Sequence, residues 1–593
     1  MAHLSENVRR LKEVRLEISS PAQLSSIGAL QDETWFFVLP FAPNNYPKAL
    51  PSTWENAFVS FAKRASENTT IAILTTPYAA ANLYLALEHD VYFKLWIAVK
   101  IAGAATDSPG LPQQHAALLI LTRYERSLVH TKTRIEYTYC PYCEKTTKDY
   151  GGKKHTYHEY GTLMSDVWRD VCPDAGGIFP EQIADRLADL FGVEPFRKLC
   201  CADMRHVVGT DQVSERHESF ADPSEIRDCA IEEPHVLRQG DCLELLGTIP
   251  TSSIDFCFAD PPYNLSKKYE NWHDTLEIQA YFEWCDRWLS ELARVVKPGR
   301  TVAVLNIPLW AIRHFAHLQT ILRFQYWIVW EGLSMPVRMI MPAHYAILCF
   351  SKGEPRVPPG LFSRESHAHA EDELLTLKES YCLRELCIKS RRLHEEDRAP
   401  ITDLWWDIHR LKHNCRRVDH PCQLPPRLMR RLISLFTRPG ERILDPFNGV
   451  GTTTLAAEEL GRRFIGMELS EYYHKIAAAR HAELRSGEDP FRKTKTTPKA
   501  KNSRVARLKK QVYAVPKKVL QLDIKRIAAQ LGRLPTRAEV ERLSKYPIAY
   551  FDDYFISWGE VCAAARTTGM VEVKGQRRSE TLDRQLTLFS ESE

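Results

Sequence analysis

The segment Arg442–Ser470, "RILDPFNGVGTTTLAAEELGRRFIGMELS", decides the fold of this chain. Its apolar start predicts a strand that ends at Asp445, after which a turn with Gly449 and Gly451 opens a helix. A second apolar run ends at Glu468, 23 residues after Asp445. An acid about twenty residues beyond a glycine-rich turn often grips ribose hydroxyls in Rossmann-like folds. The segment therefore predicts a site for a nucleoside-containing cofactor. Because it lacks Gly-Lys-Ser/Thr, it does not indicate a triphosphate-binding loop.

Strands and helices are predicted to alternate before this segment as well. Apolar runs typical of strands are "IDFCFADPP", "GRTVAVLN", "QYWIVWEG" and "HYAILCFSK", while helical spacing occurs in "IQAYFEWCDRWLSELARVV" and "PPRLMRRLISLFT". Such alternation indicates an α/β fold with a doubly wound, Rossmann-like sheet.

The first half of the chain repeats this layout with gaps. Four blocks match in the same order: "FKLWIAVK" with "FQYWIVWE", "HAALLIL" with "HYAILCF", "MSDVWRDV" with "ITDLWWDI", and "PEQIADRLADLF" with "PPRLMRRLISLF". The sheet is therefore predicted to be duplicated. The first copy has Leu39 at the place of Asp260 and no glycine-rich turn after Phe191. We expect it to be a degenerate module, kept for docking or DNA contact.

A second strand end also carries polar residues. The stretch "FCFADPPYNL", residues 256–265, closes an apolar run with an acid, two prolines and a tyrosine. Proline fixes φ and has no backbone donor, so this turn should be rigid. Taken alone, this stretch could be no more than a rigid turn at the end of a strand. Beside a cofactor segment, it favours a functional site.

These two stretches together carry a family resemblance. "DPPY" with "DPF.G.GTT" resembles the amino-group DNA methyltransferases that use S-adenosylmethionine, and the order of the motifs resembles the circularly permuted β class. The resemblance covers about residues 236–484. "HPCQLP", residues 420–425, resembles that family's "HPTQKP" but has Cys422 for threonine and Leu424 for lysine, which leaves a cofactor contact from the lysine position without support.

The resemblance implies roles for individual residues. Asp241, in "GDCLELL", would lie near the adenine of the cofactor. The implied cofactor-binding residues are Asp241, Asp445, Pro446, Phe447, Gly449, Gly451, Thr452 and Glu468, and the implied catalytic residues are Asp260, Pro261, Pro262 and Tyr263.

The catalytic turn suits chemistry on an exocyclic amine, which is a poor nucleophile because its lone pair is delocalised into the base. Asp260 and the carbonyl of Pro261 can both accept hydrogen bonds from the NH₂ group, which favours a pyramidal nitrogen. Tyr263 offers a face on which an extruded base can stack. Asp260 can then take the proton that the nitrogen loses, and no covalent enzyme intermediate is needed.

The target base stays open between two choices. Asp and not Ser at position 260 points, by resemblance, to N6 of adenine over N4 of cytosine, and Asp and not Asn argues against glutamine methyltransferases. A non-catalytic DNA-binding subunit and an RNA base methyltransferase are further alternatives. Double-stranded DNA is the expected partner, with a cognate restriction endonuclease as a possible second one.

Cysteines suggest a second kind of site. Cys140 and Cys143 are followed by His155 and His158, which approaches the spacing of zinc ligands. The histidine spacing is slightly short, Cys200 and Cys201 could compete, and the matching region of the second copy has cysteines without a clear histidine pair. The sequence therefore favours reduced, unliganded thiols over a structural zinc ion.

Composition and charge set the remaining expectations. The chain has 593 residues, 44% hydrophobic and 26% charged, which is typical of globular proteins. No signal peptide or membrane span is predicted, and the scattered cysteines suit a reduced, cytoplasmic protein. Residues 492–518 hold eleven Lys or Arg and no acid, which leaves 68 basic against 75 acidic residues elsewhere. This segment is typical either of a phosphate-binding arm or of a solvated linker.

These signals divide the chain into segments. They are an N-terminal segment (1–30), a degenerate module (31–204), a linker (205–235), the catalytic domain (236–484), a basic linker (485–518) and a helical domain (519–593). Residues 354–400 form an insert expected to recognise the target, with Lys389, Arg391 and Arg392 available for bases or phosphates. The helical domain resembles small DNA-contacting repeats of homing endonucleases, although a protein-docking bundle is the alternative. Asp553, Glu572 and Lys574 weakly resemble the acid…acid-x-lysine motif of metal-dependent nucleases.

Overall fold

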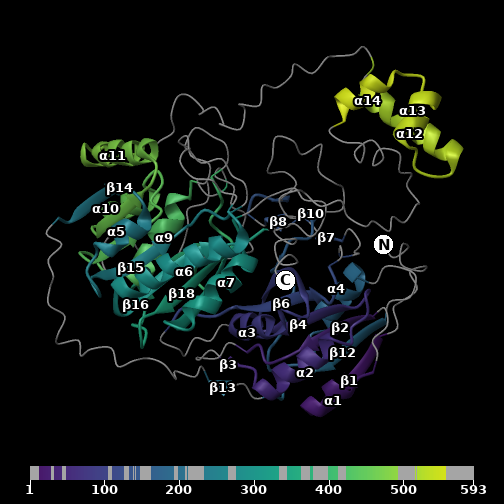
Figure 1. The fold of residues 1–593 in the computed structure, drawn as a ribbon, viewed down its shortest axis with the longest axis horizontal. Coiled ribbons are helices and arrows are strands. Elements are labelled where there is room, and N and C mark those ends of the chain that lie inside the picture. Colours follow the sequence, from purple (N-terminus) through teal and green to yellow (C-terminus); the bar gives the residue numbers. More distant parts are fainter. Residues whose placement is uncertain are drawn as a thin grey trace. The chain divides into compact units, whose positions relative to one another are not determined.

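The computed structural model describes residues 13–28, 33–42, 48–103, 110–125, 128, 133–135, 137, 139–140, 142–146, 162–191, 198–207, 210–211, 233–264, 276–332, 343–361, 374–377, 387, 398–411, 423–491, 515 and 517–555. Contacts divide the chain into one unit of residues 1–498 with 576–593 and another of residues 499–575. Two large sheets belong to the first unit (Figure 1).

The second half of the chain forms an eight-stranded sheet. Its strands are β14 (His235–Gln239), β15 (Ile254–Ala259), β16 (Val296–Asn306), β17 (Arg323–Trp330), β18 (Tyr345–Ser351), β21 (Leu404–Trp405), β22 (Arg442–Asp445) and β23 (Arg463–Glu468). They lie in the order β14-β23-β22-β15-β16-β18-β17-β21. All neighbours are parallel except β18, which runs antiparallel to β16 and β17.

Helices cover both faces of this sheet, which confirms the doubly wound α/β fold. They are α5 (Cys242–Gly247), α6 (Ile278–Val295), α7 (Pro308–Leu318), α9 (Pro426–Phe436), α10 (Thr452–Glu459) and α11 (Glu471–Arg485), with a short 3-10 turn, η4 (Pro359–Leu361). Phe256 and Phe258 of β15 pack in the core beneath α9 and α10, whereas Cys257 and Ala259 pack in the core beneath α6 and α7. The strand is buried on both faces, so its sequence is continuously apolar.

The first half of the chain forms a seven-stranded sheet. Its strands are β1 (Glu13–Glu17), β2 (Glu33–Val38), β4 (Thr70–Thr75), β5 (Tyr92–Lys100), β6 (His115–Thr122), β11 (Val167–Trp168) and β12 (Lys198–Asp203). Its helices are α1 (Pro21–Ser26), α2 (Ser52–Ala62), α3 (Pro77–Leu87) and α4 (Glu181–Phe191). The edge strand β1 lies in the segment 1–30 and pairs with β12.

Short strand pairs complete the first unit. They are β3 (Lys48–Ala49) with β13 (Thr210–Asp211), β7 (Arg134–Ile135) with β10 (Thr162–Leu163), β8 (Tyr139–Cys140) with β9 (Lys145–Thr146), and β19 (Leu375–Leu377) with β20 (Arg398–Pro400). The last pair brackets much of the insert 354–400.

The predicted duplication is confirmed by the two sheets. The strand order β12-β2-β4-β6-β5-β11 of the first sheet matches β22-β15-β16-β18-β17-β21 of the second. Even an irregularity repeats: the register of β5 against β6 shifts between Phe93 and Leu95, and that of β17 against β18 shifts between Phe324 and Tyr326. Matching order, direction and register shift are hard to explain except by a shared ancestral module.

The first copy lacks both strand-end carboxylates. Leu39, at the place of Asp260, is fully buried. β12 pairs with β2 as β22 pairs with β15, and in these pairings Ala202 of the first copy is equivalent to Asp445 of the second. At the positions equivalent to Asp260 and Asp445 the first sheet therefore has two apolar side chains, and the acid that ends β12, Asp203, pairs with Arg205.

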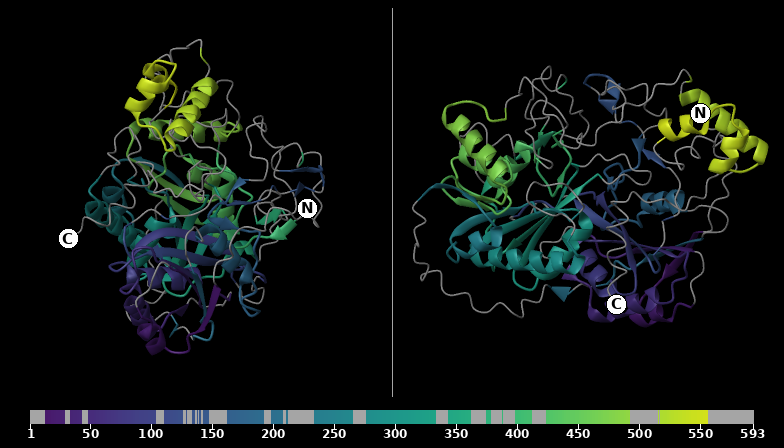
Figure 2. Two further views of the ribbon diagram at one scale, coloured as in Figure 1. Left: turned by 90° about the vertical axis from the view of Figure 1, so that its right-hand side faces the viewer. Right: turned by 45° about the horizontal axis from the view of Figure 1, so that its top comes forward.

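The two copies pack against each other through equivalent residues (Figures 1 and 2). His115 Nδ1 lies 2.8 Å from the carboxylate of Asp403, and His344 Nδ1 lies 3.1 Å from the carboxylate of Asp166. In the sequence repeat, His115 matches His344 and Asp166 matches Asp403. Each acid also accepts a backbone hydrogen bond of 2.7 Å from the residue preceding the histidine. Such reciprocal contacts are those of a two-fold interface.

An aromatic pair marks the local two-fold axis. Trp96 and Trp327, which are equivalent in the repeat, stack with ring centroids 4.3 Å apart and an interplanar angle of 5°. Both indoles are 2% exposed. The chain thus contains, in one polypeptide, the arrangement that a homodimer makes from two.

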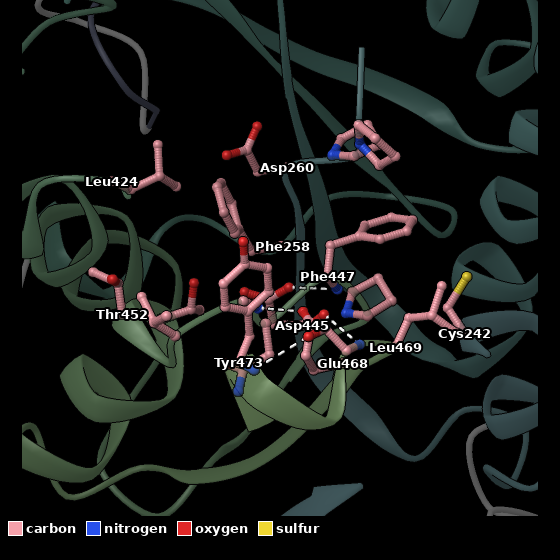
Figure 3. Close-up of a pocket in the computed structure, with 18 of the residues that line it drawn as sticks. Cys242, Phe258, Asp260, Leu424, Asp445, Phe447, Thr452, Glu468, Leu469 and Tyr473 are labelled. Atoms are coloured by element: carbon pink, nitrogen blue, oxygen red, sulfur yellow. Dashed lines mark hydrogen bonds between the residues drawn. The ribbon is translucent and has the colours of Figure 1, made fainter. Parts of the chain in front are cut away.

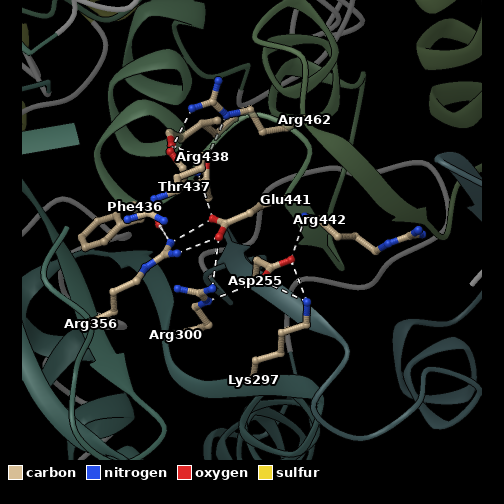
Figure 4. A network of polar contacts seen from close by, with 11 residues as sticks. Asp255, Lys297, Arg300, Arg356, Phe436, Thr437, Arg438, Glu441, Arg442 and Arg462 are labelled. Atoms are coloured by element: carbon tan, nitrogen blue, oxygen red, sulfur yellow. Dashed lines mark hydrogen bonds and ion pairs between the residues drawn. The ribbon is translucent and has the colours of Figure 1, made fainter. Parts of the chain in front are cut away.

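A charged network at the opposite end of the second sheet connects β15 with β16 and β22 (Figure 4). Asp255 binds Lys297 Nζ at 3.1 Å and accepts a 3.0 Å hydrogen bond from the backbone N–H of Arg442. Arg300 connects Asp255 with Glu441, and Arg356 binds the same Glu441 through two nitrogens. The network links the starts of β15 and β22, whose far ends carry Asp260 and Asp445.

Replacing Asp255 by asparagine should lower the free energy of unfolding by about 2 kcal/mol, because two buried charge-assisted contacts lose their ionised partner. Chemical denaturation measures this loss when the variants have the same dependence of unfolding free energy on denaturant concentration. Asp286→Asn, on a half-exposed acid of α6, is the control and should change stability by less than about 0.5 kcal/mol. Equal stability of the two variants would contradict a structural role for the network.

The described residues of the second unit form three helices, in the region expected to be helical. They are α12 (Lys517–Leu531), α13 (Arg537–Leu543) and α14 (Ile548–Tyr554), around a core that includes Ile524, Val540 and Phe551. Thr536 begins α13 with a capping box to Glu539. Among the helices described in both units, none has the length and apolar character needed to span a membrane.

Candidate active site

A pocket lies at the carboxyl ends of β15, β22 and β23 (Figure 3). Measured to its open mouth, it encloses about 1060 Å³. The predicted site residues that line it are Asp241, Asp260, Pro261, Pro262, Tyr263, Asp445, Pro446, Phe447, Gly449, Thr452 and Glu468. The two strand ends that the sequence separates by almost two hundred residues therefore meet in one crevice.

Gly451 is the one predicted cofactor-binding residue that does not line the pocket. It precedes α10 with φ of +83°, and a Cβ there would lie 3.1 Å from Cβ of Ala477. Its contribution is to the turn, because an L side chain would strain the backbone and crowd α11.

Three carboxylates from three strand ends face this pocket. Asp445 is buried, and its Oδ1 accepts a 2.9 Å hydrogen bond from the N–H of Phe447. Burial, together with the negative charges of Asp260 and Glu468, raises the pKa of Asp445 to about 7, against hydrogen bonds from Thr453 and Phe447 that lower it. The pocket thus concentrates negative potential and should attract a cation.

Glu468 holds the glycine turn in place. Its Oε2 accepts a hydrogen bond of 2.8 Å from the N–H of Gly449, and its Oε1 accepts one of 2.8 Å from the N–H of Ser470. Burial raises the pKa of Glu468, whereas these backbone donors act in the opposite direction. Each oxygen retains a second lone pair, so the carboxylate can also accept from a ligand hydroxyl.

The turn after β15 is fixed by hydrogen bonds to its own backbone. The Tyr281 hydroxyl donates to the carbonyl of Pro262 at 2.7 Å, and Trp310 Nε1 donates to the carbonyl of Tyr263 at 2.8 Å. Neither donor uses the carbonyl of Pro261, and no other residue in the described part of the chain donates to it. This carbonyl and the carboxylate of Asp260 can therefore act together as acceptors.

Tyr263 takes a position that its sequence did not predict. The side chain is 6% exposed, and its hydroxyl donates a 2.7 Å hydrogen bond to Oδ1 of Asp260. Its ring centroid lies 6.2 Å from that of Tyr345. The tyrosine thus orients the carboxylate in addition to lining the pocket.

Asp241 and Leu424 both line the pocket. Asp241 begins α5, and its Oδ1 accepts a 2.8 Å hydrogen bond from the N–H of Leu243. Leu424 stands at the lysine position of the related family motif and brings an apolar side chain to the pocket (Figure 3). Any ligand there meets no cation from that position.

Sequence reasoning missed several residues of the wall. Trp284 of α6, Asn448 of the glycine turn and Tyr473 of α11 line the pocket. Trp284 and Tyr473 occupy apolar positions of helices and look like core residues in the sequence. Asn448 could have been found, because it stands inside the glycine-rich turn; its side chain accepts a 3.0 Å hydrogen bond from Thr454.

Some predicted residues lie outside the described residues. They are His155, His158, Lys389, Arg391, Arg392, Cys422, Glu572 and Lys574, and most of the basic segment 492–518. Cys140 and Cys143 are described but lie away from this pocket.

Comparison with known proteins places this site in a family. The N6/N4 family described as DNA methylase matches residues 254–479. The type II methyltransferase M.BamHI of Bacillus amyloliquefaciens is 34% identical over 240 residues, which are 39% of this chain and 54% of that protein. M.HpaI of Haemophilus parainfluenzae is 28% identical over 249 residues, 40% of this chain and 72% of that protein. The chain thus spans about half the length of M.BamHI.

Solved structures are similar over the same share of the chain. PvuII DNA methyltransferase, described as cytosine-N4-specific, is 21% identical with a TM-score of 0.31 and covers 41% of this chain and 84% of its own. M1.HpyAVI in complex with SAM is 18% identical with a TM-score of 0.28 and covers 42% and 98%. The family match and the two curated relatives agree with the strand-end motifs: residues 254–479 of this chain belong to the N6/N4 DNA methylase family.

Proposed function

We propose that this chain is a site-specific DNA methyltransferase that methylates N6 of adenine, with S-adenosylmethionine as the methyl donor. The convergence of Asp260, Asp445 and Glu468 in one pocket carries this proposal. The two curated relatives are named type II methyltransferases, which supports a site-specific role on double-stranded DNA beside a cognate restriction endonuclease.

The pocket fits this cofactor. S-adenosylmethionine supplies a methyl group activated on a positively charged sulfonium. Three buried or partly buried carboxylates that repel one another gain stability when a cation enters, as the raised pKa of Asp445 indicates. Glu468 would hold the ribose hydroxyls, Asp241 would lie towards the adenine, and the backbone at Gly449 would allow close approach.

The chain's own residues would position and deprotonate the target amine. The carboxylate of Asp260 and the carbonyl of Pro261 would accept its two hydrogens and direct the nitrogen lone pair at the methyl group. The methylated nitrogen would carry a positive charge, and Asp260 would take one of its protons directly or through water. Tyr263 would keep the carboxylate oriented through its 2.7 Å hydrogen bond.

DNA contacts are proposed for three parts of the chain. The insert 354–400 adjoins the sheet that forms the pocket and is proposed to read the target sequence. The basic segment 492–518 would bind phosphates, and the helices of residues 517–555 would add further DNA contact. The first copy, which lacks both carboxylates, would support docking and not catalysis.

Nucleoside analysis tests the proposed function directly. The purified chain is incubated with labelled S-adenosylmethionine and, in separate reactions, with plasmid DNA or RNA. The nucleic acid is then digested to nucleosides. We expect the label in N6-methyl-2′-deoxyadenosine. Label in N4-methyl-2′-deoxycytidine would instead identify cytosine as the target base, since the same two acceptors can also bind the N4 amine of cytosine. Label in RNA but not in duplex DNA, or cofactor binding without any transfer, would overturn the proposal.

A further inference from the structure

Three cysteines from the two copies converge at one point away from the pocket. The Sγ atoms of Cys140, Cys143 and Cys387 all lie within 4.8 Å of one another. Cys140 and Cys387 are 1% and 3% exposed. The first two belong to the degenerate copy, whereas Cys387 belongs to the insert 354–400 of the second copy. The cluster therefore joins two parts of the chain that are far apart in sequence.

The hairpin that carries Cys140 and Cys143 is very short. Cys140 ends β8, Cys143 lies in the turn, and β9 begins at Lys145; each strand has two residues. Glu144 takes a φ of +52°, which turns the chain back directly after the second cysteine. An isolated hairpin of this size is not stable through its own backbone pairing, so it needs another source of stability.

Among the residues that the structure describes, cysteines are the buried side chains at this hairpin. In the described part of the chain, Cys140 and Cys387 form a separate buried cluster against which Cys143 packs. The nearby aromatic side chains Tyr139 and Tyr142 are 54% and 49% exposed. Three thiols contribute little hydrophobic stabilisation. Small units without an apolar core are commonly held together by a metal ion.

The cysteines that meet lie in equivalent segments of the two copies. In the first copy, Cys140 and Cys143 lie between β6 and β11; in the second, Cys387 lies between the equivalent strands β18 and β21. Equivalent segments meet where they approach a two-fold axis, as Trp96 and Trp327 do. A site with ligands from both copies is therefore expected close to such an axis.

We propose that Cys140, Cys143 and Cys387 bind a structural zinc ion that joins the degenerate copy to the insert of the second copy. Zinc–thiolate bonds are about 2.3 Å long, so sulfurs around a tetrahedral ion lie about 3.8 Å apart, which agrees with the observed cluster. Three sulfurs fill three of the four positions around a tetrahedral ion and leave the fourth for a further ligand. Binding releases the thiol protons.

This site gives the degenerate copy a structural purpose. A module without catalytic carboxylates would still supply two ligands that anchor the insert proposed to read DNA. The proposal concerns metal content and stability, so it can succeed or fail independently of the proposed methyl transfer.

Metal analysis of the full chain, purified in reducing buffer without chelator, tests the site. We expect about one zinc per chain by elemental mass spectrometry, and three or four sulfur ligands by X-ray absorption. A chelator combined with a thiol-modifying mercurial should release this zinc and lower the melting temperature. Wild-type protein without zinc that also fails to take it up at micromolar concentration would overturn the proposal.

Single substitutions assign the ligands. Cys387→Ser should lose at least about nine tenths of the zinc, and Cys387→His, which keeps a ligand atom, should restore most of it if the variant folds. Cys172→Ser, at an exposed cysteine of the same module outside the cluster, should retain full zinc content. Circular dichroism shows whether each variant is folded. Full zinc in folded Cys387→Ser would show that the ion is bound elsewhere.

Discussion

Replacing Asp260 by asparagine should lower the rate of methyl transfer by about 10³-fold while changing the affinity for S-adenosylmethionine by less than about tenfold. Asparagine keeps one acceptor oxygen and the approximate shape of the side chain, so the target amine can still be bound. It cannot accept the proton that the nitrogen must lose, and its amide carries no charge to stabilise a cationic amine. The loss should therefore fall on the chemical step.

Single-turnover kinetics with saturating DNA, together with cofactor binding by calorimetry, separates these effects. Asp286→Asn removes an acid of the same domain from the outer side of α6 and should leave both quantities unchanged. The Tyr263→Phe variant removes only the hydroxyl that orients Asp260 and should cost about tenfold in rate. A variant at position 260 that transfers methyl groups at the normal rate would exclude Asp260 as the proton acceptor.

The meeting of Asp260 with Asp445 could be predicted from sequence. Both follow apolar strands, and parallel strands of a doubly wound sheet end at the same edge. The structure makes β15 and β22 direct neighbours, with Phe256 opposite Ile443, so the two acids share one pocket. The duplication was also visible, because four short blocks repeat in order and the two sheets have the same strand order.

Contacts between distant apolar or isolated residues could not be predicted in the same way. Trp284 and Tyr473 line the pocket from helices whose sequences do not distinguish a pocket wall from a core. The sequence indicated that His115 matches His344, but not that each would lie against an acid of the other copy. Cys382 and Cys387 stand at the place in the second copy that matches Cys140 and Cys143, but without a clear histidine pair. Only packing across the two copies brings Cys387 to Cys140.

The affinity for S-adenosylmethionine should fall about tenfold for each pH unit below 7, and about 100-fold between pH 8 and pH 5. Burial, followed by the charges of Asp260 and Glu468, raises the pKa of Asp445 to about 7. Above that pH the carboxylate is ionised and attracts the sulfonium. Below it a proton occupies Asp445 and must leave before the charge can pair, so the affinity rises with pH and becomes constant above 7.

S-adenosylhomocysteine separates this effect from general pH dependence. It has a neutral thioether in place of the sulfonium, so its affinity should vary several-fold less over the same range when both ligands are titrated by calorimetry. In Asp445→Asn the slope for S-adenosylmethionine should flatten, and its affinity at pH 8 should approach the wild-type value at low pH. The pKa of Glu468 is also raised, so titration of Glu468 would account for any pH dependence of the affinity that remains in this variant. Equal slopes for the charged and the neutral ligand would mean that the three carboxylates do not bind the cofactor through its positive charge. The two ligands differ at the sulfur by that charge and by an uncharged methyl group, and only the charge interacts differently with an ionised and a protonated carboxylate.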